Sequence, residues 1–206
     1  MPISGLVLGL QITTEMVSRG MPGSAHTPQF TNAIGTGIAN GLLASAYSGV
    51  STGLGFGTGV STGVITGPAT IPTSLATLIM SAMIANGMPG SDKTLPFVNA
   101  LAAAIAQHIA AVVITGSSTL VASGTGVGTI TGITPTGLSS LIQLELESVN
   151  MGGPAGYPKI STALGNAIAS AILSSVVNTT IVGVPVGPPP SLNPVPATGV
   201  DTGVLT

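Results

Sequence analysis

The sequence GMPGSAHTPQFTNAIGTGIANGLLA at residues 20–44 returns without a gap at residues 87–111 as GMPGSDKTLPFVNALAAAIAQHIAA. Of the 25 aligned positions, 12 are identical. A third and more divergent copy, NMGGPAGYPKISTALGNAIASAI, occupies residues 150–172. Because a sequence that repeats at a regular spacing indicates a repeat architecture, we expect an α+β fold of three tandem helix-turn-helix-β repeats.

Each copy contains a turn followed by a helix with one apolar stripe, in which large apolar residues recur every four positions. The stripe has the same spacing and similar bulk in the three copies, so the three helices should pack in equivalent surroundings, such as a pseudo-threefold arrangement would give. The positions between are mostly Gly and Ala, which suits a helix covered on all sides. The expected packing residues of the assembly are Phe30, Ile34, Ile38, Leu42, Phe97, Leu101, Ile105, Ile109, Ile160, Leu164, Ile168 and Ile172.

A second amphipathic helix is expected before each of these turns. In the second copy it follows Pro72, and Leu75, Ile79 and Met83 lie on one face. These helices should end near Gly20, Gly87 and Asn150, since Gly and Asn adopt the left-handed conformation that closes a helix. Thr27 and Thr94 are the expected N-caps of the helices that follow.

Segments rich in Gly, Ser, Thr and Val follow at residues 48–67, 112–132 and 176–187. They could be flexible linkers, but the regular recurrence of β-branched residues favours short strands joined by tight turns. Short strands are marginal alone, so we expect them to pair with strand edges of neighbouring repeats or neighbouring chains.

The resulting domain plan has repeat 1 at residues 1–67, repeat 2 at 68–132 and an abbreviated repeat 3 at 133–184. Residues 185–206 form a proline-rich segment, expected to be an extended, partly polyproline-like arm that cannot join a central strand. Such an arm either dangles or drapes over a neighbour, and its Val and Leu residues favour draping.

Charge is the most unusual property of the composition. Charged residues make up 4% of the chain, where about 25% is typical of soluble domains. A surface so poor in charge should be covered by copies of the same chain or by other structural proteins. Three basic residues, Arg19, Lys93 and Lys159, are too few to bind a nucleic acid backbone.

Residues 98–114 form the best candidate for a membrane span, but they are fewer than the roughly 20 that a span needs and include Asn99, Gln107 and His108. A buried helix is therefore favoured, and a membrane partner is not expected. The N-terminus has no basic region and no cleavage site before the first repeat, so we expect no signal peptide.

No catalytic, metal or cofactor site is expected. The acid–base side chains are few and scattered, and the glycine runs lack the lysine and helix that a phosphate-binding loop needs. Glu15 is expected to form a surface pair with Arg19 four residues later. The side chains of the chain that could act in acid–base chemistry are Glu15, Asp92, Glu145, Glu147, Asp201, His26 and His108.

The stretch from Pro96 to Gly132, an alanine-rich helix followed by glycine-punctuated strands, resembles small Ala/Gly/Thr-rich structural proteins of tailed bacteriophages. The resemblance implies a non-enzymatic virion component of tail, baseplate or head, assembled in the host cytoplasm, with no active residues to carry over. A membrane-associated protein with Ala-rich helices in lipid is the alternative. A third alternative is an ice- or glycan-binding protein, though the threonines lack the regular array that ice binding would require.

Overall fold

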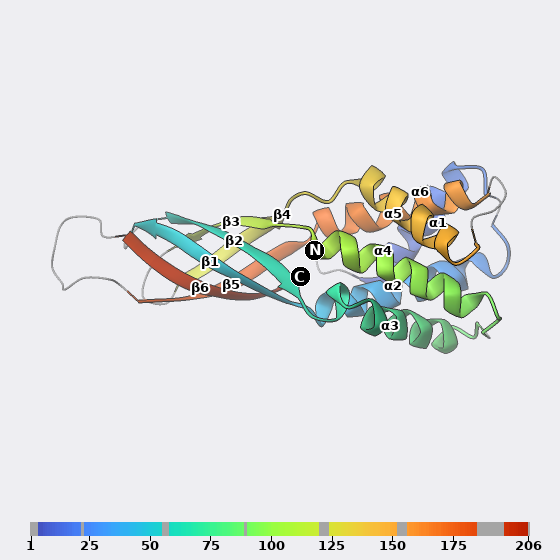
Figure 1. Ribbon diagram of the computed structural model, residues 1–206, viewed down its shortest axis with the longest axis horizontal. Coiled ribbons are helices and arrows are strands. Elements are labelled where there is room, and N and C mark those ends of the chain that lie inside the picture. The colour runs from blue at the N-terminus through green and yellow to red at the C-terminus, as the bar shows by residue number, and fades with distance from the viewer. Residues whose placement is uncertain are drawn as a thin grey trace.

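The fold is α+β, as the sequence predicts, and the molecule is elongated with helices at one end and strands at the other (Figure 1). A computed structural model describes residues 4–21, 23–54, 58–88, 90–119, 124–151, 156–184 and 196–205. Along this part of the chain, two helices and then two strands follow one another three times, with a short 3₁₀ turn, Pro68–Thr70, before the third helix.

The six helices of the described residues form a closed ring. Each packs against the next one in the chain, and α6 packs against α1. Three outer helices alternate with three inner ones, which are buried over more of their length. The outer helices are α1 (Gly5–Ser18), α3 (Pro72–Ala85) and α5 (Pro135–Ser148), and the inner helices are α2 (Thr27–Leu43), α4 (Thr94–Ala110) and α6 (Gly156–Leu173).

The inner helices carry the apolar stripes predicted from the sequence, and the stripes meet in the centre of the bundle. Of the twelve stripe residues, all but Phe30 and Ile160 are buried, and these two are half-buried against the same core. The rings of Phe30 and Phe97 lie with their centroids 5.6 Å apart, so the stripes of α2 and α4 contact each other directly. These side chains therefore pack within one chain.

Small residues allow the helices to approach closely. A Cβ atom at Gly9 would overlap the backbone of Asn32, and one at Gly35 would overlap α1. On the other side of α2, a Cβ at Gly37 would overlap the backbone of Ile79 in α3. Glycine is thus required where α2 is clamped between two neighbours, in line with the expectation of a helix covered on all sides.

The outer helices end as the sequence predicts. Gly20, Gly87 and Asn150 have φ angles of 70°, 71° and 55°, in the left-handed region. The residue after each one donates its N–H to a carbonyl of the last helical turn, for example from Met88 to Met83 at 3.0 Å. This is the Schellman motif, which satisfies carbonyls that the helix end leaves free.

Replacing Gly87 by Ala should destabilise the fold by about 1 kcal/mol, because an L side chain is strained in the left-handed region. Gly90→Ala is the matched control, since Gly90 lies outside that region and a Cβ there meets nothing within 4 Å. Thermal unfolding followed by circular dichroism should show a lower Tm for Gly87→Ala alone. Equal Tm values for the two variants would contradict the assigned backbone conformation.

The predicted N-caps are wrong by one position. Thr27 and Thr94 are the first residues of α2 and α4, and His26 and Lys93 occupy the cap positions. The threonine hydroxyls instead accept hydrogen bonds from the backbone N–H of Ser24 (2.8 Å) and of Ser91 (2.9 Å). Threonine thus secures the turn that precedes the helix, a local bond that competes with capping.

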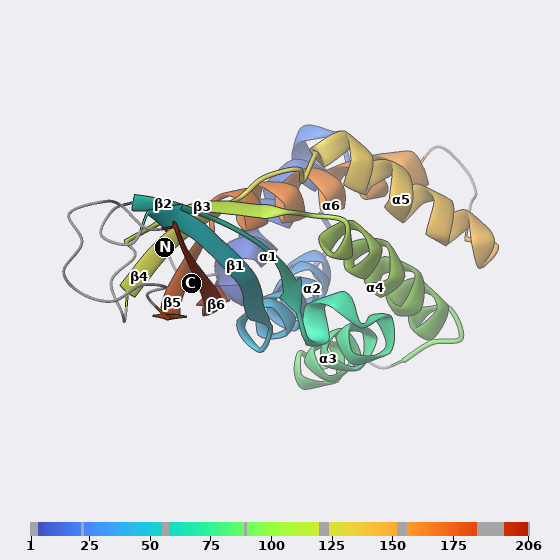
Figure 2. The ribbon, with the colours of Figure 1, turned by 60° about the vertical axis from the view of Figure 1, so that its left-hand side comes forward.

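The Gly/Thr/Val segments form strands, as predicted. Each described strand is antiparallel to the next in the chain, and β6 pairs with β1, which closes a barrel. The strands leave the bundle together from one end (Figure 2). They are β1 (Ala46–Leu54), β2 (Thr58–Thr66), β3 (Ile114–Thr119), β4 (Gly124–Ile130), β5 (Val176–Val184) and β6 (Pro196–Leu205).

Of the two pairings expected for these strands, the one within the chain is present, as between β2 and β3, and closure corrects the other, with edges in neighbouring chains. Each of the six described strands has a partner on both sides within the chain, so none offers a free edge to another subunit. A closed sheet removes the edges on which such pairing depends. Contacts between subunits would therefore have to use side chains on the outer surface.

The predicted arm at residues 185–206 is also wrong in part. Residues 196–205 form β6, which pairs with β1 on one side and with β5 on the other. Proline is compatible with this strand because Pro196 is its first residue, and Ala197–Leu205 contains no proline. Residues 185–195 lie outside the described residues.

Where the barrel meets the bundle, its interior is filled by large side chains. Tyr47, Ile114 and Val177, one from each odd-numbered strand, are buried there with Ile65 and Ile130. The Tyr47 hydroxyl lies 2.8 Å from the hydroxyl of Ser61. This layer joins the barrel to the helical core.

Glycine makes the space for Tyr47. Gly49 and Gly63 are directly opposite each other on β1 and β2, and a Cβ at either position would overlap the tyrosine ring or its hydroxyl. The narrow barrel thus accepts one aromatic ring because two facing positions have no side chain.

Gly63→Ala should destabilise the protein by about 1–3 kcal/mol, because the added methyl would lie 2.6 Å from the Gly49 Cα and from the tyrosine ring. Gly128→Ala, on the equivalent side of β4, is the control. Its nearest neighbour would be a side-chain methyl of Ile114 at 3.2 Å, which can move aside. Denaturant unfolding should rank Gly63→Ala well below Gly128→Ala, and the reverse order would refute this packing.

Candidate functional site

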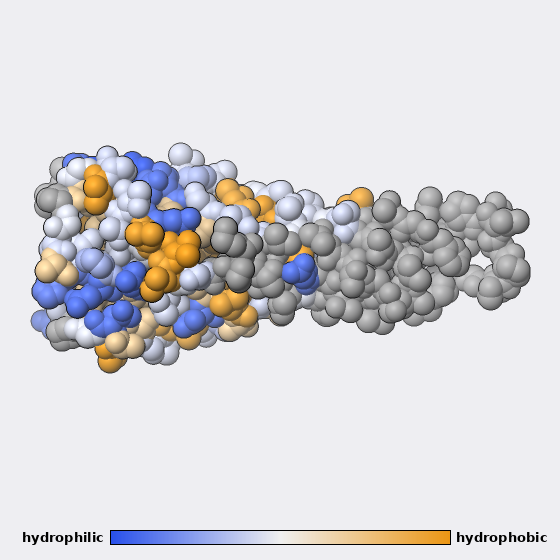
Figure 3. All heavy atoms as spheres, turned by 180° about the vertical axis from the view of Figure 1, so that it is seen from behind, coloured by the Kyte–Doolittle hydropathy of each residue, from blue (hydrophilic) through white to orange (hydrophobic). Residues whose placement is uncertain are grey.

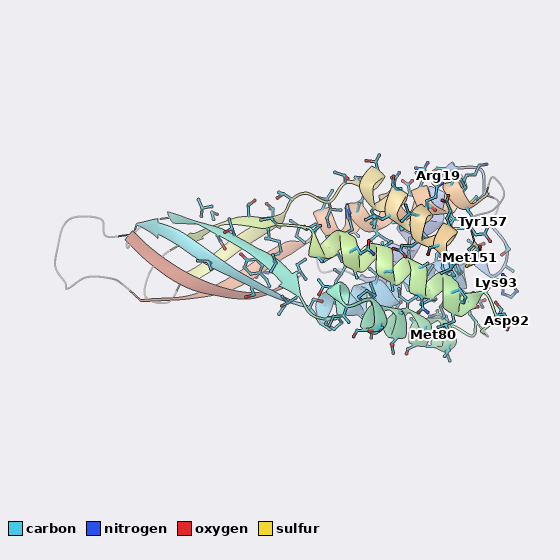
Figure 4. The ribbon with its side chains drawn as sticks, in the orientation of Figure 1. Arg19, Met80, Asp92, Lys93, Met151 and Tyr157 are labelled. Atoms are coloured by element: carbon cyan, nitrogen blue, oxygen red, sulfur yellow. The ribbon has the colours of Figure 1, made fainter. Side chains whose placement is uncertain are left out.

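The charged side chains gather at one end of the molecule. Except for Asp201 in β6, all of them are carried by helix ends or turns on the side away from the strands, and Glu145 reaches back from there to Gln107 in the barrel-side part of α4. Figure 4 labels Arg19, Asp92 and Lys93 at this end. The full set comprises Glu15 and Arg19 at the end of α1, Asp92 and Lys93 before α4, Glu145 and Glu147 in the last turn of α5, and Lys159 in the first turn of α6.

Two of these carboxylates form hydrogen bonds between helices. The predicted Glu15–Arg19 pair is present at 3.1 Å, and Asn166 of α6 donates a second hydrogen bond to the same Glu15 oxygen at 3.2 Å. Glu145 in α5 accepts a hydrogen bond from Gln107 of α4 at 3.1 Å. Both carboxylates thus accept a hydrogen bond from a side-chain amide of the neighbouring inner helix, and these bonds hold the helices together.

The two histidines are far apart in the fold. His26 lies in the turn before α2 with its Nδ1 3.0 Å from the Gln29 side-chain oxygen. His108 lies near the other end of α4, where its Nε2 accepts a hydrogen bond from the Thr134 backbone N–H at 3.3 Å. Burial lowers the pKa of His108, because desolvation disfavours the imidazolium.

His108 should make the fold less stable in acid. Its pKa lies below the unfolded value of 6.5, so the unfolded chain binds more protons as the pH falls from 6.5 towards the folded pKa. Stability is then fully present above pH 6.5 and decreases below it, and protonation also removes the acceptor for Thr134. The Tm of His108→Gln should fall less than that of the native protein between pH 7.5 and 5.5, with His26→Gln as control. A native-like pH dependence in His108→Gln would exclude this assignment.

Among the described residues no group of three or more His, Cys, Asp or Glu is placed to hold a metal ion. Tyr47 and Ser61, a pair of buried hydroxyl side chains on neighbouring strands, lie inside the barrel among core residues. The sites that the sequence offered as acid–base candidates are therefore dispersed over the bundle and the barrel.

The most distinctive surface is apolar, and sequence reasoning missed it. On α1, Leu6, Val7 and Leu10 are 71%, 51% and 66% exposed. Apolar patches are visible between polar ones on the face of the bundle in Figure 3. Leu8 and Ile12 form the buried face of α1. Leu6 and Leu10, four residues apart and outside that face, were the sequence signal for an exposed apolar surface.

A groove lies on a second face, between α3 and α4. It has a volume of about 340 Å³ and carries no charged side chain. Met80 and Leu95 are its large apolar side chains, and Leu95 is exposed. Its lining residues are Thr73, Ala76, Thr77, Met80, Ser81, Leu95 and Asn99.

No family model matches this chain, and neither a curated protein nor a solved structure matches it. In the part of the chain that the structure describes, no helix has the length and apolar character needed to cross a membrane. The twelve stripe residues lie in the core of one chain. The exposed apolar surfaces described above are those of α1 and of the α3–α4 groove.

Proposed function

We propose that the chain is a non-enzymatic structural subunit of a large assembly, and that this assembly is a phage virion. The observation that carries the proposal is the separation of charge along the molecule. All charged side chains except Asp201 belong to helix ends and turns of the bundle, whereas the sides of the bundle and barrel expose apolar residues such as Leu6, Leu10, Val50 and Val60. Exposed apolar surface with so little charge favours coverage by protein partners.

The proposed subunit consists of three copies of one unit around the long axis. Gly5, Pro72 and Pro135, the first residues of the three outer helices, are 67 and 63 residues apart. Met21, Met88 and Met151 have the same spacings. The left-handed residues Gly20, Gly87 and Asn150 repeat them as well. In this proposal the units begin as predicted, at residues 1, 68 and 133, and the third unit includes β6.

A three-unit rod suits a structural role. The chain closes both a ring of helices and a ring of strands by itself, so one copy presents the geometry that three smaller subunits would otherwise have to assemble. The resemblance of residues 96–132 to structural proteins of tailed phages supports a virion as the assembly. Tail, baseplate and head remain equally suitable positions.

The test is the protein content of particles. In a culture that produces this chain and forms phage particles, quantitative mass spectrometry of density-purified particles should find the chain at a constant ratio to the major capsid protein. The matched control is a soluble host protein of similar abundance, which purification should deplete. Co-depletion of this chain with that control would overturn the proposed function.

A further inference from the structure

The outer helices differ at three surface positions. Leu6, Val7 and Leu10 of α1 correspond, at the repeat spacings of 67 and 63 residues, to Thr73, Ser74 and Thr77 of α3 and to Thr136, Gly137 and Ser140 of α5. Leu6 and Leu10 are exposed, as are their counterparts. Single exposed apolar residues also occur on α3 (Ile84) and on α5 (Leu144). A cluster of three such residues occurs only on α1 among the described outer helices, and it indicates a specific contact. We call Leu6, Val7 and Leu10 the α1 ridge.

The α3–α4 groove arises from a second difference between the units. In the first unit, Gly9 and Gly35 let α1 and α2 approach until a Cβ atom would overlap the opposite helix. Ala76 and Ala102 stand at the corresponding positions of α3 and α4, and their methyl groups prevent so close an approach. The groove opens beside Ala76, with Met80 on the next turn.

Ridge and groove lie at the same height along the molecule. Leu6 and Leu10 occupy the first two turns of α1, and Thr73 and Thr77 occupy the same turns of α3. Both outer helices begin at the junction with the barrel and run away from it (Figure 1). A copy placed beside another, parallel and without axial displacement, therefore brings its ridge level with Thr73 and Thr77 in the barrel-side part of the neighbour's groove, and Met80 and Leu95 lie further from the barrel.

Both surfaces are also free of charge. The ridge and the groove lining contain no Asp, Glu, Lys or Arg, so neither surface would leave an ion unpaired when water is removed. Apolar side chains that enter an apolar groove of another helix pair follow the ordinary packing of ridges into grooves. A second copy of this chain supplies an uncharged apolar partner at the height of the barrel-side part of the groove.

We propose that the α1 ridge of one copy docks in the α3–α4 groove of a second, parallel copy. The contact rests on the proposed structural function and names its first partner. It is heterologous, so each docked copy still presents one free ridge and one free groove. Addition continues until a ring closes or a filament forms, with all the charged ends on the same side.

Engineered cysteines test the contact directly, since the native chain contains no cysteine. Leu10→Cys and Thr77→Cys are prepared as separate single variants, mixed, and oxidised under mild conditions. The mixture should give a disulfide-linked dimer on a non-reducing gel, and each variant alone should give little. Efficient linkage of Leu10→Cys alone would show an α1–α1 contact and overturn the proposal, as would the absence of linkage in the mixture.

A second variant keeps the proposal falsifiable in solution. Leu6→Thr, Val7→Ser and Leu10→Thr together give α1 the residues that α3 carries at the same positions, all on the surface. Light scattering should show a large species for the native chain and its loss in the triple variant. Leu144→Thr, at a 62% exposed position of α5, should assemble like the native chain. A triple variant that assembles normally would exclude the ridge as the contact.

The two proposals fail separately. If the chain is a constant component of purified particles but the Leu10–Thr77 link does not form, only the ridge-and-groove contact is wrong. If the link forms and the chain is absent from particles, the contact stands and the virion function is wrong.

Discussion

The structure depends on the close packing of three inner helices around one apolar centre. Ten of the twelve stripe residues are buried and Phe30 reaches Phe97 across the centre. Such a core leaves little room on the other faces of the inner helices, and at Gly35, Gly37 and Gly165 a neighbouring helix approaches nearly to backbone contact. Glycine and alanine between the stripe residues follow from that close approach, because larger side chains would separate the helices and expose the centre.

The barrel follows from the same arrangement. Each inner helix ends at the junction with the barrel and is followed by a strand that continues in the same direction (Figure 1). The spacing of the three helices therefore sets the diameter of the barrel where it begins. The barrel is narrow, and glycines at facing positions such as Gly49 and Gly63 give it room for Tyr47. The glycines of the inner helices and of the strands next to the junction are thus consequences of close packing around a narrow centre.

The sequence predicted the features that local chemistry determines. The stripes, the second set of helices and the left-handed ends at Gly20, Gly87 and Asn150 were confirmed because each depends on spacing within about a dozen residues. The location of the N-caps was wrong because a threonine hydroxyl serves equally well in a turn. Closure of the barrel was missed because it pairs β1 with β6, far apart in the chain, and because the prolines before residue 197 concealed the alternation of β6.

The candidate surfaces were even less accessible from the sequence. The α1 ridge becomes distinctive only when Leu6 and Leu10 are aligned with Thr73 and Thr77 and are known to face outward. The groove depends on the separation of α3 and α4, which the spacing of residues in the sequence does not encode.

The pairing of β1 with β6 also affects how the protein is synthesised. Ala46 pairs with Val204, so β1 has no partner on that side until all the residues between them have been synthesised. The first hairpin therefore has an open edge during synthesis, and a chaperone that shields β1 would raise the yield of native protein.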